Sequence, residues 1–247
     1  MERYQIIIAY DGTDFHGSQY QPDVRTIQRE IETALHRLEW TGKSVIFSSR
    51  TDTGVHAAGQ VAAFDMDWNH SPDDLRNALN ALLPNDVAIK KLIQCSRDFQ
   101  PRFHAVSRKY RYRIYCQPIR DPIKERFAWR VWPRPDFEIM KITSNFMLGV
   151  HDFSSFGNPT STDGTTIRKV NSVQWRTDED DITFEIVANA FLYHMVRRLI
   201  FVFIQIGQKN MEVGEFYDFI NNPQPNPIQG LAPSQGLHLI EINYPVD

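Results

Sequence analysis

Lys109-Tyr110-Arg111-Tyr112-Arg113-Ile114-Tyr115 alternates almost residue by residue between basic side chains and aromatic or aliphatic ones. Successive side chains of a β-strand point to opposite faces of its sheet. We therefore expect Tyr110, Tyr112 and Ile114 on one face, and the arginines with Tyr115 on the other. The stretch predicts a strand that opens the second half of the chain.

The segment before this strand predicts the order β-α-β-β-α-β. Short apolar runs indicate strands over residues 5–10, 44–47, 60–64 and 87–93. Thr26 can cap a helix whose core-facing side carries Ile27, Ile31, Leu35 and Leu38. Ser71-Pro72-Asp73-Asp74 begins a second helix, because serine caps, proline fits the first turn and the acids face the positive helix end.

The segment after the strand repeats that order with one extra helix. A helix with Ile139, Ile142 and Phe146 on one side is expected to end at Gly149. Further strands are expected over 170–175, 182–188 and 237–242, and helices over 190–206 and 213–220. The repeat predicts an α+β fold of two split-βαβ, ferredoxin-like units, each with a mostly antiparallel mixed sheet covered by helices. We expect these units to be 1–103 and 104–247, with the active-site cleft between them.

The composition is typical of an ordered globular protein. The chain has 247 residues, of which 42% are hydrophobic and 23% charged, so it can bury a substantial core. It has neither an apolar run of about 18 residues nor a signal-peptide layout, so no membrane association is expected. Cys95 and Cys116 form no metal spacing and no disulfide framework. Both features fit a reducing, cytoplasmic location.

The charge distribution is more informative than the net charge of −3. Basic residues gather over 97–113 and again over 120–134, against a single acid, Asp98, in the first of these segments. A basic segment at the join between two units suits a long polyanion, because phosphate groups bind Lys and Arg. A solvated surface is the alternative that charge alone leaves open.

The loop Ser49-Arg50-Thr51-Asp52-Thr53-Gly54-Val55-His56-Ala57 joins two expected strands. Thr-Asp-Thr-Gly is ordinary turn chemistry, since aspartate bonds nearby backbone and glycine accepts a positive φ. The segment nevertheless resembles the Arg-Thr-Asp-Xaa-Gly-Val-His-Ala signature of the TruA family of tRNA pseudouridine synthases. Further blocks follow in family order over almost the whole chain: Tyr10-Asp11-Gly12 with Phe15, Gly17 and Gln19; 83–87; Arg102-Phe103, Ala105 and Tyr110-Arg111-Tyr112; His151-Asp152-Phe153; Thr166-Ile167-Arg168; 189–197; Ala232-Pro233, Gly236-Leu237 and Tyr244-Pro245.

Two positions depart from the family pattern. Ser18 stands where the family usually has tryptophan, and Pro101 stands where it usually has alanine. Neither residue belongs to the expected chemistry, but Ser18 changes the local packing around Gln19.

The resemblance implies a pseudouridine synthase fold and a cofactor-free isomerase that converts uridine to pseudouridine. Its substrate would be tRNA, at positions 38, 39 and 40 of the anticodon arm, and the enzyme would act as a homodimer. The family pattern assigns the catalytic carboxylate to Asp52, its guanidinium partner to Arg197 and the aromatic neighbour of the target base to Tyr110. RNA contacts are expected from Arg50, Arg108, Lys109 and Arg168.

Other interpretations of these residues are weaker. His56 and His194 have no third ligand at metal spacing, so we expect structural histidines and no metal site. Asp52 with Asp11 or Asp14 could form a carboxylate pair for glycoside cleavage, which would release a free base or sugar. A non-catalytic tRNA-binding protein on the same scaffold would not need Asp52, Tyr110 and Arg197 together.

We predict that activity requires neither a metal ion nor a nucleotide cofactor, because the isomerisation consumes no oxidant, reductant or water. The sequence also has no phosphate-binding loop of the GxxxxGK[ST] type. Dialysis against EDTA is expected to leave the rate of pseudouridine formation unchanged on a tRNA whose fold is verified separately. A loss of rate that zinc or magnesium restores would contradict this prediction.

Overall fold

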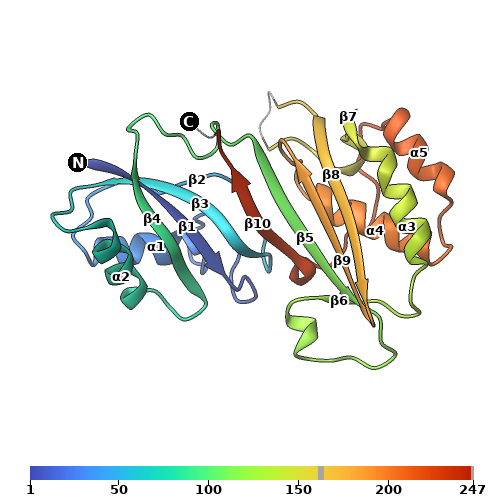
Figure 1. Cartoon of the computed structure of the whole chain (residues 1–247), viewed down its shortest axis with the longest axis horizontal. Helices are drawn as coiled ribbons and strands as arrows, with labels where there is room; N and C mark the ends of the chain where they lie inside the picture. The colour runs from blue at the N-terminus through green and yellow to red at the C-terminus, as the bar shows by residue number, and fades with distance from the viewer. Residues whose placement is uncertain (161–163, 246–247) are drawn as a thin grey trace. The chain divides into compact units, whose positions relative to one another are not determined.

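The computed structural model describes residues 1–160 and 164–245, which form two compact units (Figure 1). The first unit comprises Met1–Val106 and His238–Asp247, and the second comprises Ser107–Leu237. This division differs from the expected 1–103 and 104–247, above all at the end of the chain. The last strand, β10 (Leu237–Asn243), pairs in parallel with the first residues of β3 (His56–Met66), and so it belongs with the first unit.

The sheet of the first unit has the order β4-β1-β3 with antiparallel pairing throughout. Its other strands are β1 (Glu2–Tyr10), β2 (Ile46–Phe47) and β4 (Val87–Cys95). The edge of β3 away from β1 receives two partners. β2 pairs antiparallel with Ala62 and Ala63, whereas β10 pairs with His56 and Ala57, immediately after the Asp52 loop.

Both helices of the first unit begin where the sequence predicts. In α1 (Ile27–His36) the Thr26 hydroxyl accepts a hydrogen bond from the Arg29 amide, although Leu38 lies beyond the end of the helix. In α2 (Pro72–Leu82) Ser71 and Asp74 bond each other's backbone amides in a capping box.

The second unit has the antiparallel order β5-β9-β8-β7. Its strands are β5 (Ser107–Tyr115), β6 (Trp129–Arg130), β7 (Gly149–Asp152), β8 (Ile167–Asp178) and β9 (Asp181–Ala188), with β6 parallel to β5. Tyr110, Tyr112 and Ile114 are buried, as the alternation predicts. Tyr115 is buried as well, because its hydroxyl accepts a hydrogen bond from the Asp121 amide of the following loop.

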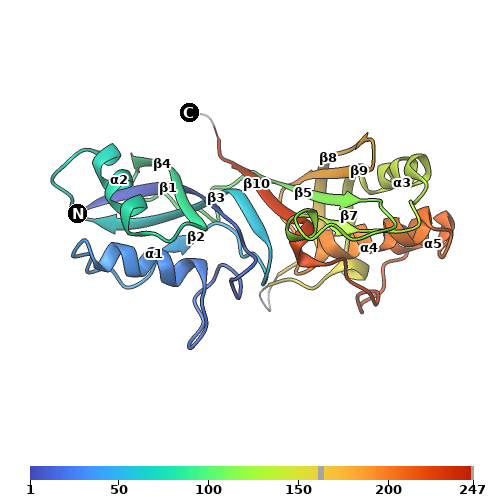
Figure 2. The same cartoon turned by 90° about the horizontal axis from the view of Figure 1, so that it is seen from below.

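The helices of the second unit are α3 (Phe137–Ser144), α4 (Met195–Gly207) and α5 (Val213–Asn221). Figure 2 shows α4 and α5 on one side of its sheet, and α4 packs there through Phe203, which contacts Trp175 of β8 and Phe184 of β9. Short 3-10 turns span Lys124–Arg126, Asn145–Met147, Ser154–Phe156 and Ser234–Gly236. Within the described ranges, none of the helices has the length and apolar character needed to cross a membrane.

Two predicted helices of this unit were wrong in detail. The helix expected from residue 190 begins at Met195, because His194 has a left-handed backbone (φ 64°) and the Tyr193 amide bonds the Asn158 carbonyl instead. The helix expected to end at Gly149 ends at Ser144 and buries Met140 and Thr143. Ile142, which was expected on one side of this helix with Ile139 and Phe146, is 61% exposed.

The prediction of a mostly antiparallel α+β fold is nevertheless confirmed. In the second unit, one buried carboxylate links β9 to β5. Glu185 of β9 lies opposite Arg111 of β5, is 4% exposed, and pairs with Lys109 Nζ at 2.8 Å and an Arg111 nitrogen at 2.6 Å. Burial raises the pKa of Glu185, but the hydrogen bonds from Lys109 and Arg111 outweigh it, so the pKa lies below its ordinary value.

We predict that Glu185→Gln lowers the free energy of unfolding more at pH 7 than at pH 3.5. A depressed carboxylate pKa contributes stability that is present above the unfolded pKa, about 4.3, and is lost as pH falls through the folded pKa. Urea unfolding of both proteins at the two pH values measures the effect. Glu241→Gln, at an exposed position of β10, serves as the control. An equal destabilisation by Glu185→Gln at both pH values would contradict the prediction.

Candidate active site

Asp52 lies in the loop between β2 and β3, and its backbone forms the turn that the sequence predicts. The Val55 amide donates to the Asp52 carbonyl at 3.1 Å, and Gly54, with φ +77°, donates to the Phe15 carbonyl at 3.3 Å. The Asp52 side chain is half-buried. Turn chemistry accounts for the backbone of this loop, and it leaves the carboxylate partly accessible.

Thr51 connects the loop to β1. It is buried, and its hydroxyl shares a 2.8 Å hydrogen bond with the hydroxyl of Tyr10 on β1. Burial raises the pKa of Tyr10 to about 12, so this phenol stays protonated at neutral pH. Ser18, the departure from the family pattern, is fully buried and accepts a 2.9 Å hydrogen bond from the Thr51 amide.

His56 follows the loop. The Gly12 amide donates a hydrogen bond to His56 Nδ1 at 3.0 Å. Asp11 Oδ1 lies 3.2 Å from the same nitrogen. The His56 ring stacks on His238 of β10, with 4.7 Å between the ring centroids. The described residues contain no group of three or more His, Cys, Asp or Glu side chains placed to hold a metal ion.

Asp11, one member of the alternative carboxylate pair, is engaged locally. Its Oδ1 accepts hydrogen bonds from the Thr13 amide at 3.1 Å and the Thr13 hydroxyl at 2.6 Å. These bonds close a turn next to Gly12, whose missing side chain lets the Val55 carbonyl approach: a Cβ on Gly12 would lie 2.0 Å from that oxygen. Asp11 therefore stabilises the turn that holds Gly12.

The second unit holds Tyr110 and Arg197. Tyr110 on β5 is 7% exposed, and its ring meets that of Phe191 edge to face, with 4.9 Å between the centroids. Arg197, in the first turn of α4, donates from Nε to the Ala232 carbonyl at 2.7 Å, and its own carbonyl accepts from the Ala232 amide at 3.2 Å. These bonds fix the base of the arginine side chain against the loop before β10.

Tyr112 differs from Tyr110 although both lie on the same strand face. It is fully buried, and its hydroxyl donates to the Pro233 carbonyl at 2.7 Å. Burial raises the pKa of Tyr112 well above its ordinary value, against a smaller lowering by the charge of Arg197. Gly236 packs directly on this ring, since a Cβ there would lie 2.5 Å from Tyr112 Cζ. Tyr112 is therefore a packing residue.

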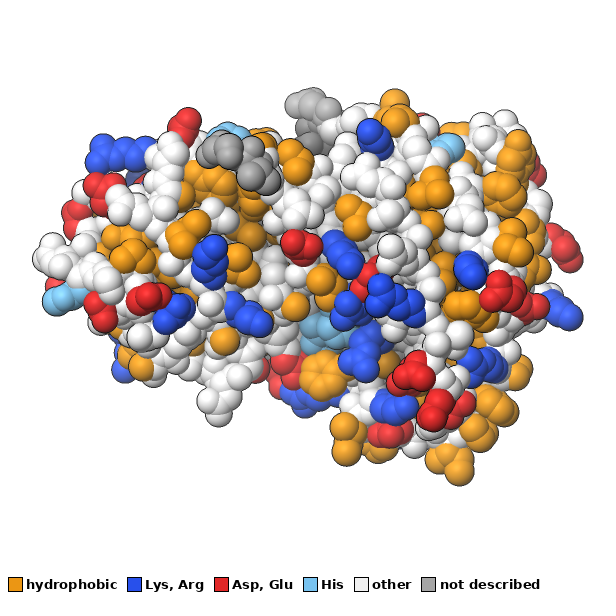
Figure 3. Space-filling view, viewed as in Figure 1, with side chains coloured by type: hydrophobic (Ala, Val, Ile, Leu, Met, Phe, Trp, Pro, Cys, Tyr) orange, Lys and Arg blue, Asp and Glu red, His pale blue; other side chains and the backbone are white. Residues whose placement is uncertain are grey.

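The four residues expected to contact RNA differ in their accessibility. Arg50 is exposed, whereas Lys109 pairs with Glu185. Arg108 is 8% exposed and donates to the Asn189 carbonyl, and Arg168 donates to the carbonyls of Thr165 and Ile167. Lys and Arg side chains still gather over the strands of the second unit in Figure 3. Arg113 of β5 is exposed.

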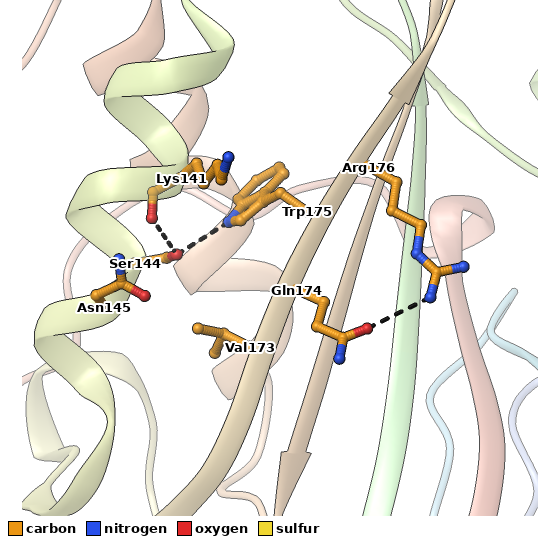
Figure 4. A pocket seen from close by; sticks show the side chains of 7 residues that line it. All are labelled: Lys141, Ser144, Asn145, Val173, Gln174, Trp175 and Arg176. Carbon is orange, nitrogen blue, oxygen red and sulfur yellow. Dashed lines mark hydrogen bonds between the residues drawn. The ribbon is translucent and has the colours of Figure 1, made fainter.

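A shallow pocket of about 280 Å³ lies between α3 and β8 (Figure 4). Its lining includes Ser144, whose hydroxyl accepts from the Trp175 indole nitrogen at 3.0 Å, and the side chains of Gln174 and Arg176. None of the residues predicted for catalysis or RNA binding lines it. All of the lining residues belong to the second unit, and none of them comes from β5 or α4.

The structure thus places Asp52 and Arg50 in the first unit, and Tyr110, Arg108, Lys109, Arg168 and Arg197 in the second. Ser18, Tyr10 and Gln60, which bond Ser49 and Thr51 of the Asp52 loop, were not predicted to contact it. Gln60 lies in a predicted strand and offers no signal of its own, but Ser18 was already marked as a departure from the family pattern.

Comparison with known proteins identifies the family. The family model described as tRNA pseudouridine synthase matches residues 6–104 and 145–245. Proteins named tRNA pseudouridine synthase A are 34% identical in Acetivibrio thermocellus and 36% identical in Listeria welshimeri, over 99% of this chain and 100% of each relative. A solved Cbf5-Nop10-Gar1 complex aligns at 11% identity with a TM-score of 0.37, covering 81% of this chain and 44% of that one, which adds nothing to the assignment. On the family match and the full-length relatives, this chain belongs to the tRNA pseudouridine synthase family.

Proposed function

We propose that the chain converts uridine to pseudouridine at positions 38, 39 and 40 in the anticodon arm of tRNA, with Asp52 as its catalytic carboxylate. The observation that carries this proposal is a half-buried aspartate on a loop whose backbone is fixed on both sides. The matched family segments include Asp52 and Arg197, whereas Tyr110 lies between the two segments. Relatives that align over nearly the whole chain cover that gap.

The reaction breaks the N1–C1′ bond of a uridine and joins C5 of the same base to C1′. The product is an isomer of the substrate. C5 loses one proton and N1 gains one, so atoms and electrons balance. The target base has to leave its stack before a protein side chain can reach it. Asp52 then supplies a carboxylate for covalent or proton-transfer work beside the sugar and base.

The other residues have supporting roles in this proposal. The family pattern gives Arg197 the role of orienting the catalytic carboxylate through its planar guanidinium group. Tyr110 stacks on the flipped uracil, and Arg50 fills the space that the base leaves or holds the RNA backbone. Arg108, Lys109 and Arg168 contact phosphates. The enzyme works in the cytoplasm as a homodimer in which each tRNA meets both subunits.

We predict that Asp52→Asn abolishes turnover while folding and tRNA binding persist. Asparagine keeps the size and the turn-forming oxygen of the side chain, but it has no negative charge and no nucleophile or base. The experiment compares the melting temperature, tRNA affinity and single-turnover pseudouridine yield of the variant with those of the wild type. Asp14→Asn, at an exposed position in the alternative carboxylate pair, is the control and should retain activity.

If the Asp52→Asn protein folds and binds tRNA, its single-turnover rate tests the assignment of Asp52 directly. Loss of a general acid or base costs about 10²- to 10⁴-fold in rate. Pseudouridine formation at more than about a hundredth of the wild-type rate would falsify the assignment of Asp52. Release of a free base or sugar by the wild-type enzyme would instead favour glycoside cleavage.

We predict opposite effects for leucine at the two neighbouring tyrosines. Tyr110→Leu removes the proposed stacking ring and should sharply reduce the single-turnover rate per folded molecule. Tyr112→Leu removes a fully buried ring and its bond to Pro233, so it should lower the melting temperature while the rate per folded molecule changes far less. Equal rates per folded molecule in the two variants would exclude Tyr110 from the site.

A further inference from the structure

The residues just before Asp52 are held by side chains rather than by a strand partner. Ser49 and Thr51 lie between β2 and β3, outside the paired segments. Their backbone groups need other partners, because an unpaired buried amide or carbonyl is costly. The partners come from three separate parts of the first unit: the β1 strand, the segment before α1, and β3.

Ser18 forms hydrogen bonds with both backbone polar groups of Thr51. The Ser18 amide donates to the Thr51 carbonyl at 3.0 Å, and the Ser18 hydroxyl accepts from the Thr51 amide at 2.9 Å. Ser18 is itself fixed, because its carbonyl accepts from the Gln28 amide in the first turn of α1 at 3.0 Å. The start of α1 is thereby connected to the residue next to Asp52.

Gln60 performs the same task for Ser49. Its side-chain amide donates to the Ser49 carbonyl at 2.8 Å, and its side-chain oxygen accepts from the Ser49 amide at 3.3 Å. Gln60 is fully buried, and Tyr10 completes the set through its hydrogen bond to the Thr51 hydroxyl. Arg50, between the two anchored residues, is exposed, and Asp52 follows them half-buried.

We propose that Ser18, with Tyr10 and Gln60, positions Asp52 by fixing both backbone groups of Ser49 and Thr51. The inference rests on the proposed role of Asp52, and it assigns a function to the hydroxyl that replaces the family's usual tryptophan. Ser18 contacts the residue before Asp52 and acts through it, as a positioning residue. Displacement of a reacting group by about 1 Å can cost on the order of 10²-fold in rate.

Ser18→Ala tests this role against a control with the same local chemistry. Ser155, in the second unit, is equally buried and also accepts a hydrogen bond from a backbone amide, that of Gln224 at 2.8 Å. Ser155→Ala should therefore lose a similar bond and a similar amount of stability. Both variants are compared with the wild type in melting temperature, tRNA dissociation constant and single-turnover rate at saturating tRNA.

The expected result is a split between binding and chemistry. Ser18→Ala should bind tRNA within about twofold of wild type and lose at least about tenfold in single-turnover rate, whereas Ser155→Ala keeps the wild-type rate. A Ser18→Ala enzyme with the wild-type rate would overturn the inference, as would a loss of rate shared equally by both variants. If Ser18→Ala does not fold, Tyr10→Phe, which removes only the hydroxyl that bonds Thr51, decides by the same criteria.

Asp52→Asn, measured in the same assay, separates the two proposals. An active Asp52→Asn enzyme refutes the proposed function itself. An inactive Asp52→Asn enzyme beside a fully active Ser18→Ala enzyme refutes only the positioning role of Ser18.

Discussion

The pair of hydrogen bonds between Ser18 and Thr51, one through the Ser18 amide and one through its hydroxyl, is the contact on which the organisation of the first unit depends. It links the start of α1 to the loop after β2, two segments that no strand pairing connects. The contact requires a close approach of the backbones, and Gly17 permits it. A Cβ on Gly17, which has φ +90°, would lie 2.7 Å from the Thr51 carbonyl.

The elements that depend on local chemistry could be predicted from the sequence. Thr26 and Ser71 begin helices because capping uses groups within three residues of the helix start. The alternation over 109–115 correctly separates buried Tyr110 and Tyr112 from exposed Arg113. β6 and β7, with two and four residues, are too short to show a period.

Features that depend on residues far apart in the sequence could not be predicted from local patterns. The helix expected from residue 190 starts later because Tyr193 bonds Asn158, and no pattern within 190–206 contains that information. Lys109 pairs with Glu185, far along the chain, and no pattern around residue 109 predicts that pair. A family signature therefore suggests Asp52 from the sequence alone, whereas no pattern in the sequence points to the buried side chains that hold the loop.

The pairing of β10 with β3 also determines how late in synthesis the first unit can be completed. The first unit needs residues from both 1–106 and 238–247, so a ribosome must synthesise the whole second unit before the edge of β3 can be completed. Translation at about 5–20 residues per second puts this delay on the order of ten seconds. During that interval the nascent chain carries Asp52 in a sheet that still lacks β10, and His56 lacks the stacked ring of His238. Completion of the edge of β3, the strand that follows the Asp52 loop, therefore has to wait for synthesis of β10.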